Sequence, residues 1–392
     1  MIRKTSISIL FSGIVLMLYS CRSEIKYQNL DGFKITAQQF KNQIDSIAVS
    51  TWSPDTITLL FVGDVMQHKP QITAAKNSDG SYNYFECFQH LTNEVKAADI
   101  SVANLETTLG DIRFTGYPMF CAPKDLAQGL KETGFNLIIT ANNHSLDRFS
   151  KGVELTINAL DSLELPHLGT YINKGEKEIG HPYYITLHKK KLAFMNYTYG
   201  TNGISITPPT IVNLIDTTEI KKDLQLANAQ KADIKIVCIH WGAEYFTKPN
   251  KAQIELGKWL IENGSTHVIG SHPHVIQPIE IYKDSILQED RVVAYSLGNF
   301  ISNMSKPNTD GGMVLKLKIY DDYGFMKTKV SYSLAWVGKP IHTKKKNYIL
   351  YPAGYPLDSL NKVSDNAAKS FFNLADKVMR NNHKEVEEYF IR

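Results

Sequence analysis

The chain has 392 residues, of which 43% are hydrophobic and 21% are charged, so it can bury a large core as one large domain or two modest ones. Its formal net charge of +4 is small for this length and gives no reason to expect binding to nucleic acid. The sequence also lacks the array of basic and aromatic residues that single strands require. We therefore expect no nucleic-acid partner.

The first 21 residues have the pattern of an export signal. A basic start, Met1 to Lys4, is followed by an apolar run over residues 7–19 that is too short to span a bilayer comfortably. The run ends in Leu18-Tyr19-Ser20-Cys21, which resembles a bacterial lipobox, in which the cysteine becomes the lipidated first residue of the mature protein. We predict a lipoprotein signal peptide over residues 1–21, a lipid anchor on Cys21 and a location at the cell envelope. An ordinary signal peptide and an uncleaved anchor are the alternatives.

Three cysteines remain after Cys21, namely Cys87, Cys121 and Cys238. An odd number in an oxidising compartment leaves at least one free thiol. Cys238 lies inside an apolar run and is most simply a small buried residue. The sequence leaves open whether Cys87 and Cys121 form a disulfide. It contains no Cys-x-x-Cys motif, so a sulfur-based zinc site is not expected.

The first half of the chain alternates short apolar runs with helical patterns. Residues 22–55 are polar and predict a tether with one short helix over 37–47. From residue 57 onward the alternation is typical of parallel strands joined by crossover helices. The predicted strands are 57–62, 100–103 and 137–140, and the predicted helices are 84–97, 124–133 and 152–163.

The second half is richer in strands. Runs 183–187 and 192–197 flank the polar stretch from His188 to Lys191, which predicts a hairpin. Four later runs follow one another without a helical pattern between them, so we expect them to be antiparallel. The two halves together predict two sheets packed face to face with helices outside. The remaining predicted elements are strands 234–239, 268–270, 279–282, 292–297, 313–320 and 328–337, helices 218–229 and 253–262, and a C-terminal extension, 341–392, with a helix over 365–389.

Five predicted strands end in residues of the types that bind metals. Because strand ends in α/β folds present ligands at a shared sheet edge, we expect these side chains to converge. Carboxylates, an amide oxygen and imidazoles suit a pair of divalent ions, which together activate a water and stabilise the oxygens of an in-line displacement. The residues are Asp64, Glu106, Asn143 with His144, His240, and His272 with His274.

Six short motifs follow one another along the chain. They are Gly63-Asp64, Asn104-Leu105-Glu106, Ala141-Asn142-Asn143-His144 with Asp147, His240-Trp241-Gly242-Ala243-Glu244-Tyr245, Gly270-Ser271-His272-Pro273-His274 and Tyr295-Ser296-Leu297-Gly298-Asn299-Phe300. In this order they resemble the motifs of the CapA-type poly-γ-glutamate (capsule) synthesis protein family. That family is similar to the calcineurin-like metallophosphoesterases, so the resemblance implies an α/β fold, a four-layer α/β/β/α sandwich of the metallophosphoesterase-like type, over residues 56–340.

The resemblance also implies how the site residues divide their work. Asp64, Glu106 and His274 would hold one divalent metal ion, and Glu106, Asn143, His240 and His272 a second, each ion being Mn, Fe or Zn. His144 would be the general acid, with Asp147 orienting it. Related phosphoesterases have Asp-x-His in the first motif, whereas this sequence has Met66 at the third position and His68 on a different phase. The first ion is therefore weakly bound, differently bound or absent.

The resemblance implies an exported protein of capsule or exopolymer biosynthesis. As an enzyme it would hydrolyse a phosphoester or an amide bond of an anionic envelope polymer, and capsule-synthesis membrane proteins would be its partners. The alternative is a non-catalytic component that binds the polymer through a degenerate metal site. Trp241 and Tyr245 line a substrate pocket in one interpretation and only pack in another. Asn104 orients Glu106 or merely shapes a turn, and residues 295–300 are interpreted as structural.

Overall fold

The computed structural model describes residues 55–283, 289–322, 324–380 and 386–391. The chain divides into two compact units, Met1–Trp52 and Ser53–Arg392, and every described residue belongs to the second. The predicted signal peptide, Cys21 and nearly all of the predicted tether, with its short helix, lie outside the described residues. Among the residues that are described, no helix combines the length and the apolar character needed to cross a bilayer.

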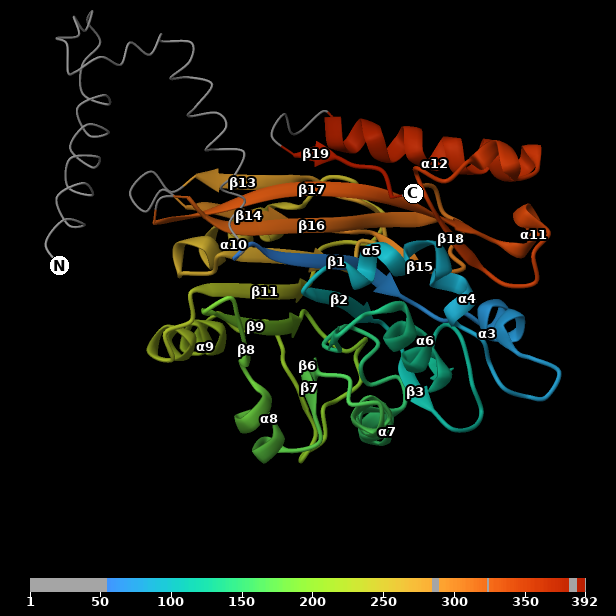
Figure 1. The fold of residues 1–392 in the computed structure, drawn as a ribbon. Helices are drawn as coiled ribbons and strands as arrows, with labels where there is room; N and C mark the ends of the chain where they lie inside the picture. Colours follow the sequence, from blue (N-terminus) through green and yellow to red (C-terminus); the bar gives the residue numbers. More distant parts are fainter. Residues whose placement is uncertain (1–54, 284–288, 323, 381–385, 392) are drawn as a thin grey trace, which may run out of the picture. The chain divides into compact units, whose positions relative to one another are not determined.

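The larger sheet of the described chain has nine strands and contains both halves of the sequence (Figure 1). Its inner strand β1 pairs in parallel with β2 on one side and antiparallel with β16 on the other. The main order is β18 (Ile349–Pro352), β17 (Phe325–Gly338), β16 (Gly311–Asp322), β1 (Ile57–Val65), β2 (Ile100–Leu105), β5 (Leu137–Ile139) and β6 (His167–Leu168), with β15 (Asn299–Ile301) beside β1 and β19 (Glu387–Glu388) beside β17.

The smaller sheet has six strands and carries the predicted hairpin. His188 and Lys189 form its turn with φ angles of 46° and 65°, as the two-residue turns that match strand twist require. The prediction of a hairpin here is confirmed. The strand order is β13 (Ile279–Lys283), β14 (Asp290–Ala294), β12 (His267–Ser271), β11 (Ile234–His240), β9 (Lys190–Thr198) and β8 (Tyr183–Leu187).

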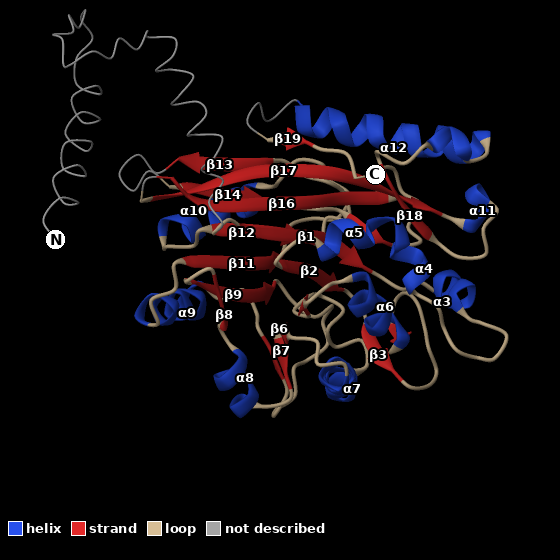
Figure 2. Cartoon of the chain, in the orientation of Figure 1, coloured by secondary structure: helices blue, strands red, loops and turns tan. Residues whose placement is uncertain are grey.

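Apolar side chains between the two sheets form the central core, in which Phe61 and Val102 of the larger sheet belong to the same cluster as Phe194 and Ile236 of the smaller one. A second cluster joins the outer face of the larger sheet to helices, and a third does the same for the smaller sheet. Figure 2 shows the helices of the described chain in blue and the strands in red. The prediction of a four-layer α/β/β/α sandwich is therefore confirmed. The covering helices are α4 (Phe85–Phe88), α5 (Thr92–Lys96), α6 (Asp125–Thr133) and α7 (Phe149–Ser162) on the larger sheet, and α9 (Thr217–Ala229) and α10 (Lys251–Glu262) on the smaller.

Local sequence explains where several of these helices begin and end. Asn250 caps α10, because its side-chain oxygen accepts the Gln253 N–H at 2.9 Å while Gln253 bonds back to the Asn250 N–H. Gly134 ends α6 with a φ of 115°, a conformation that favours glycine. The predicted helix 84–97 is broken, because the short helix η1 (Gln89–Leu91) separates α4 from α5.

The two sheets do not correspond to a parallel half and an antiparallel half of the sequence, as the strand pattern had predicted. The C-terminal strands β16 and β17 instead extend the sheet of the N-terminal strands. An apolar run that is buried on both faces carries no information about which strand will pair with it, and this explains the difference.

The segment after residue 340 is joined to the larger sheet. Strand β18 pairs with β17, and helix α12 (Lys362–Arg380) packs along β17 (Figure 1). The helix predicted over 365–389 ends earlier, since Glu387 and Glu388 pair with β17. The predicted boundary at 340 therefore does not separate the sheet from the C-terminal segment. The short elements are α3 (Lys69–Ala75), β3 (Thr108–Gly110), β4 (Cys121–Pro123), β7 (Thr170–Tyr171), α8 (Lys174–Gly180), β10 (Ile211–Val212), α11 (Pro340–Thr343) and η2 (Leu357–Ser359).

The three described cysteines are free and buried. Cys87 and Cys121 are therefore not joined by the disulfide that the sequence left open. Burial raises the pKa of the Cys238 thiol to about 12, which suits the packing role predicted for it.

Candidate metal centre

Strands β1 and β2 deliver the two carboxylates of the centre, and both Asp64 and Glu106 are fully buried. At Asp64 the chain of β1 is held by β15, because the Asp64 N–H donates to the Gly298 carbonyl at 3.0 Å. The preceding residue must be glycine, since a Cβ at Gly63 would lie 1.9 Å from the same carbonyl oxygen. The close approach of β15 thus fixes the position of Asp64.

His272 and His274 follow β12 directly, and both have backbone conformations in the left-handed region, with φ of 99° and 57°. Such strain in residues other than glycine persists only where the surroundings impose it, and it is concentrated at functional sites. Nδ1 of His274 lies 3.0 Å from Asp64 Oδ2 and 3.1 Å from Asn299 Oδ1. Its other nitrogen, Nε2, lies 3.9 Å from Glu106 Oε1. His274 therefore presents Nε2 to the centre.

His240 ends β11 and is oriented in the same manner. Its Nδ1 lies 2.8 Å from Ser271 Oγ, while Nε2 lies 2.9 Å from Asn143 Oδ1 and 3.6 Å from Glu106 Oε1. The amide of Asn143 is fixed by Asn202, whose Oδ1 accepts from Asn143 Nδ2 at 3.3 Å. The amide oxygen of Asn143 and the Nε2 atom of His240 therefore point into the same space.

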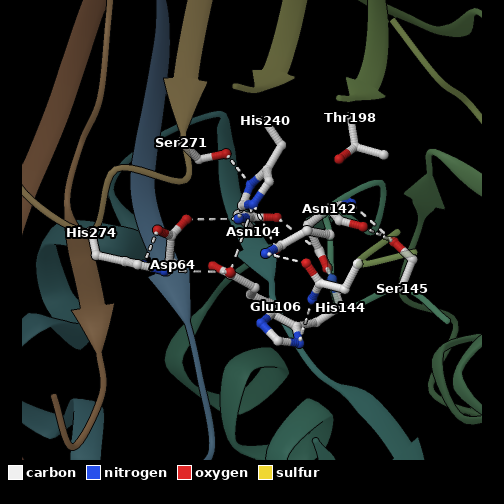
Figure 3. Close-up of polar contacts among 12 residues, drawn as sticks. Asp64, Asn104, Glu106, Asn142, His144, Ser145, Thr198, His240, Ser271 and His274 are labelled. Carbon is white, nitrogen blue, oxygen red and sulfur yellow. Dashed lines mark hydrogen bonds and ion pairs between the residues drawn. The ribbon is translucent and has the colours of Figure 1, made fainter. Parts of the chain in front are cut away.

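Glu106 is the common member of the centre (Figure 3). Within the described chain neither of its carboxylate oxygens has a hydrogen-bond partner. Burial, together with the negative charge of Asp64, raises the pKa of Glu106. Burial lowers the pKa of His240 and lowers that of His272 to about 4, so these imidazoles are neutral donors. A buried carboxylate without hydrogen-bond partners is costly unless a cation pairs with it. Carboxylate oxygens, an amide oxygen and neutral imidazoles are ligands that suit divalent ions.

Two groups of ligand-type atoms, each lying within 4.8 Å of one another, share Glu106. One contains Glu106, His272 and His274, and the other contains Asp64, Glu106 and His240. The sharing of Glu106 agrees with the bridging position that the family resemblance implies. The grouping of the histidines differs from it, because His272 falls with His274 rather than with His240.

His144 and Asp147 form a buried pair beside this centre. His144 Nδ1 lies 2.7 Å from Asp147 Oδ2, which also accepts the Phe120 N–H at 2.6 Å. Asn202 contacts both sides, with its Nδ2 at 3.4 Å from His144 Nδ1 and its Oδ1 bonded to Asn143. The contact with Asp147 is the one that an orienting role requires, and it leaves Nε2 of His144 for a reacting group.

The remaining predicted residues divide between the centre and the core. Trp241 is buried, stacks on Tyr295 and donates from Nε1 to the Tyr295 carbonyl at 2.9 Å, so the structure supports its packing role. Tyr245 is partly exposed with its ring centroid 6.2 Å from that of His274. Asn104 donates to Asp64 Oδ1 at 2.8 Å and therefore orients Asp64 rather than Glu106.

Met66 is buried and brings no imidazole to the centre. His68 belongs to neither ligand group. Its ring lies edge-on to that of Phe120, with the centroids 5.1 Å apart, and the Phe120 ring lies edge-on to that of His144, with the centroids 4.6 Å apart. Burial lowers the pKa of His68 to about 4. His68 therefore borders the centre without replacing the missing histidine.

Sequence reasoning missed three residues that orient the ligands, namely Ser271, Asn202 and Asn299. Ser271 and Asn299 lie inside motifs that the sequence already displays, and Asn299 was placed in a segment interpreted as structural. Asn202 follows no apolar strand run and has no spacing signal, so only the fold reveals it.

A comparison with protein families matches residues 58–304, more than half of the chain, to the family described as "Bacterial capsule synthesis protein PGA_cap". The chain belongs to this family. All six predicted metal ligands and the pair His144 and Asp147 lie within the matched residues.

Two curated relatives that are similar in sequence are both described as CapA. The capsule biosynthesis protein CapA of Bacillus anthracis is 25% identical over 287 residues, which cover 68% of this chain and 65% of the relative. The PGA biosynthesis protein CapA of Bacillus subtilis (strain 168) is 28% identical over 262 residues, covering 64% of this chain and 65% of the relative. The match thus spans about two thirds of the length of these relatives.

Among solved structures, the 5'-nucleotidase precursor from Thermus thermophilus aligns with a TM-score of 0.43 and 13% sequence identity. The alignment covers 82% of this chain and 59% of that protein.

Proposed function

We propose that this protein is a metal-dependent hydrolase that acts at the cell envelope in the biosynthesis of a capsule or related exopolymer. The bond that it cleaves is a phosphoester or an amide bond of the anionic polymer, such as poly-γ-glutamate. One observation carries the proposal. The buried carboxylate of Glu106 has no hydrogen-bond partner in the described chain, and its Oε1 lies 3.6 Å from Nε2 of His240 and 3.9 Å from Nε2 of His274.

The described side chains would divide the chemistry between metal binding and proton transfer. Asp64, Glu106, Asn143, His240, His272 and His274 would hold one or two Mn, Fe or Zn ions, which when bound supply a water of lowered pKa and stabilise charge on the reacting oxygens. His144 would donate a proton from Nε2 to the leaving oxygen or nitrogen, and Asp147 would keep its ring in that orientation. Asn104 and Asn299 would position Asp64 and His274.

The second candidate function is a non-catalytic polymer-binding component, and Met66 is the observation that favours it. With a thioether in place of the expected imidazole, the centre has one strong ligand fewer than the related phosphoesterases. The two candidates predict different consequences for His144, which only the hydrolase would need.

Metal content and turnover, measured on the same preparations, test the proposal. The full chain is purified from metal-supplemented medium as wild type, Glu106→Gln and His272→Ala, with the exposed Glu132→Gln as the matched control. We expect wild type and the control to contain divalent metal and to hydrolyse bis-p-nitrophenyl phosphate or a γ-glutamyl polymer, whereas the two ligand variants lose both. Metal-free wild-type protein would reject the metal centre. Metal-loaded protein without turnover on either substrate would favour the binding component.

The envelope location and its partners are part of the same proposal. A lipid anchor on Cys21 would hold the protein at a membrane surface. Capsule-synthesis membrane proteins would deliver the polymer substrate to it there. The family membership supports the polymer assignment, and the anchor rests on the sequence of the first 21 residues.

A further inference from the structure

A cavity of about 560 Å³ lies between the 302–310 loop and the segments of α11 and α12. Except for residue 303, all of its lining lies beyond residue 304, where the family match ends. None of the metal-ligand residues lines it. Two of its lining residues, Lys306 and Lys339, bring ammonium groups, and one, Asp310, brings a carboxylate.

Lys339 is a buried cation that forms no ion pair within the described chain. The residue is 9% exposed, and its ammonium donates to the Met304 carbonyl. Within the described chain no carboxylate forms an ion pair with it, and Asp310 instead accepts from Trp336 Nε1 at 3.3 Å. Burial lowers the pKa of Lys339, and the attraction of Asp310 offsets this only in part, so an anion entering the cavity would reduce the cost of the buried charge.

Lys306 links the cavity to the metal centre. Its ammonium lies 3.8 Å from the centroid of the Tyr245 ring, a cation–π contact, and the Tyr245 ring lies 6.2 Å from that of His274. The loop is tied to the centre a second time by Asn299, which donates to the Thr309 carbonyl at 2.8 Å and places its Oδ1 beside His274 Nδ1. The cavity and the centre therefore share one loop.

The charges that line the cavity favour an anion. Lys306 and Lys339 are positive and Asp310 is negative. His342 also lines the cavity, and burial together with Lys339 lowers its pKa, which keeps it neutral near pH 7. The lining is therefore positive overall. Lys306 is exposed, so an ion from solvent can reach its ammonium group.

We propose that this cavity is a second binding site, in which Lys339 and Lys306 hold a carboxylate or phosphate group of the same substrate chain whose reacting bond lies at the metal centre. This inference rests on the proposed function and narrows its substrate to a polyanion with at least two acidic groups. Its ligands are cations of this chain rather than metal, so it can be tested separately from the centre.

Calorimetric titration of the full chain with a linear γ-glutamyl tetrapeptide, and separately with inorganic phosphate, tests the site. Lys306→Met and Lys339→Met remove the charge, Lys306→Arg and Lys339→Arg keep it, and the exposed Lys345→Met, which does not line the cavity, is the control. We expect each methionine variant to bind the tetrapeptide at least about tenfold more weakly, a change of about 1.4 kcal/mol, because the variant loses a charge-assisted hydrogen bond. The arginine and control variants should bind nearly as wild type does, and added salt should weaken binding.

Each outcome supports or overturns the site. Equal affinity of wild type and Lys306→Met overturns it, and because Lys306 is exposed this variant stays informative if Lys339→Met does not fold. Lysine-dependent binding of phosphate without binding of the tetrapeptide also overturns it, since the site would then serve free phosphate. Glu106→Gln separates the two proposals: loss of metal with tetrapeptide binding retained supports both. If wild-type protein contains no metal but binds the tetrapeptide in a manner that depends on Lys306, the second binding site is supported and the metal-dependent hydrolase is rejected.

Discussion

Oδ2 of Asp64 lies 3.0 Å from Nδ1 of His274, a residue 210 positions later in the chain. Among the six predicted metal ligands, the first in the sequence thus orients the last. Asp64 contacts Nδ1 of His274, the ring nitrogen that faces away from Glu106. Asn299 contacts the same nitrogen from the other side. The candidate centre therefore depends on how its side chains orient one another as well as on which residues are present.

We expect Asp64→Asn to weaken metal binding by at least about 10- to 100-fold, the range typical of losing an orienting partner of a ligand, because Asp64 is also a proposed ligand itself. The substitution keeps the shape of the side chain but removes the charge that fixes the His274 ring. Metal titration against a competing chelator measures the effect. The exposed Asp79→Asn is the control, and equal affinity in the Asp64 variant would show that Asp64 does not contribute to the centre.

For His144→Ala we expect wild-type metal content with turnover reduced about 10²- to 10⁴-fold, the usual contribution of a positioned proton donor. Asp147→Asn should reduce turnover less, because the imidazole remains but its ring is free to rotate. His272→Ala is the matched comparison, since it should lose metal as well. If His144→Ala fully restores a deletion strain and His272→Ala does not, the metal is structural and the polymer-binding function is correct.

We expect Cys21 to carry a lipid, because Leu18-Tyr19-Ser20-Cys21 follows a basic and apolar start. Metabolic labelling with a fatty-acid analogue should mark wild type and leave Cys21→Ser unlabelled and unprocessed. Equal labelling of the two proteins would reject the lipoprotein assignment.

His267 should make the fold sensitive to acid. It is fully buried at the start of β12, neither ring nitrogen has a described partner, and burial lowers its pKa to about 3. Between pH 6.5 and about 3 the unfolded chain binds a proton here that the folded chain does not. Stability from this group is therefore complete above pH 6.5 and is lost as the pH falls through that range.

Denaturant unfolding of metal-free protein at pH 7.5 and pH 4.5 measures this contribution. Each pKa unit corresponds to about 1.4 kcal/mol, so the effect of His267 should reach a few kcal/mol at the lower pH. We expect His267→Leu to show a smaller loss of stability between the two pH values than wild type. An identical loss in both proteins would contradict the assignment to His267.

The strand ends of the site could be predicted because each signal is local. Asp64, Glu106, His240 and His272 each follow an apolar run, and runs of this kind fix both the strand and the point where the chain leaves the sheet. The family resemblance added the order of the motifs and the four layers. Sequence alone could thus predict that these residues converge. The expectation of one shared sheet edge was wrong, because Asp64 and Glu106 come from the larger sheet and the histidines from the smaller one.

The pairing itself and the supporting contacts could not be predicted in this way. Val62 of β1 lies opposite Val314 of β16, and no local pattern selects that partner. The roles of Asn202 and Asn299 depend on chain segments that only the folded sheets bring together. Nothing in the sequence marks Lys339, because its burial is set by segments that only the fold brings together.

The inner position of β1 determines the order in which the protein can assemble. One neighbour, β2, follows β1 closely along the chain, but the other, β16, is synthesised only after the whole smaller sheet. Pairings over such sequence separations form slowly, because a long stretch of chain must close before they contribute to stability. A nascent chain therefore carries β1 with one edge unpaired until β15 and β16 have been synthesised, and Asp64 depends on this edge because it pairs with Asn299 of β15. We therefore expect the candidate ligands of the two sheets to come together only after these long-range pairings have formed.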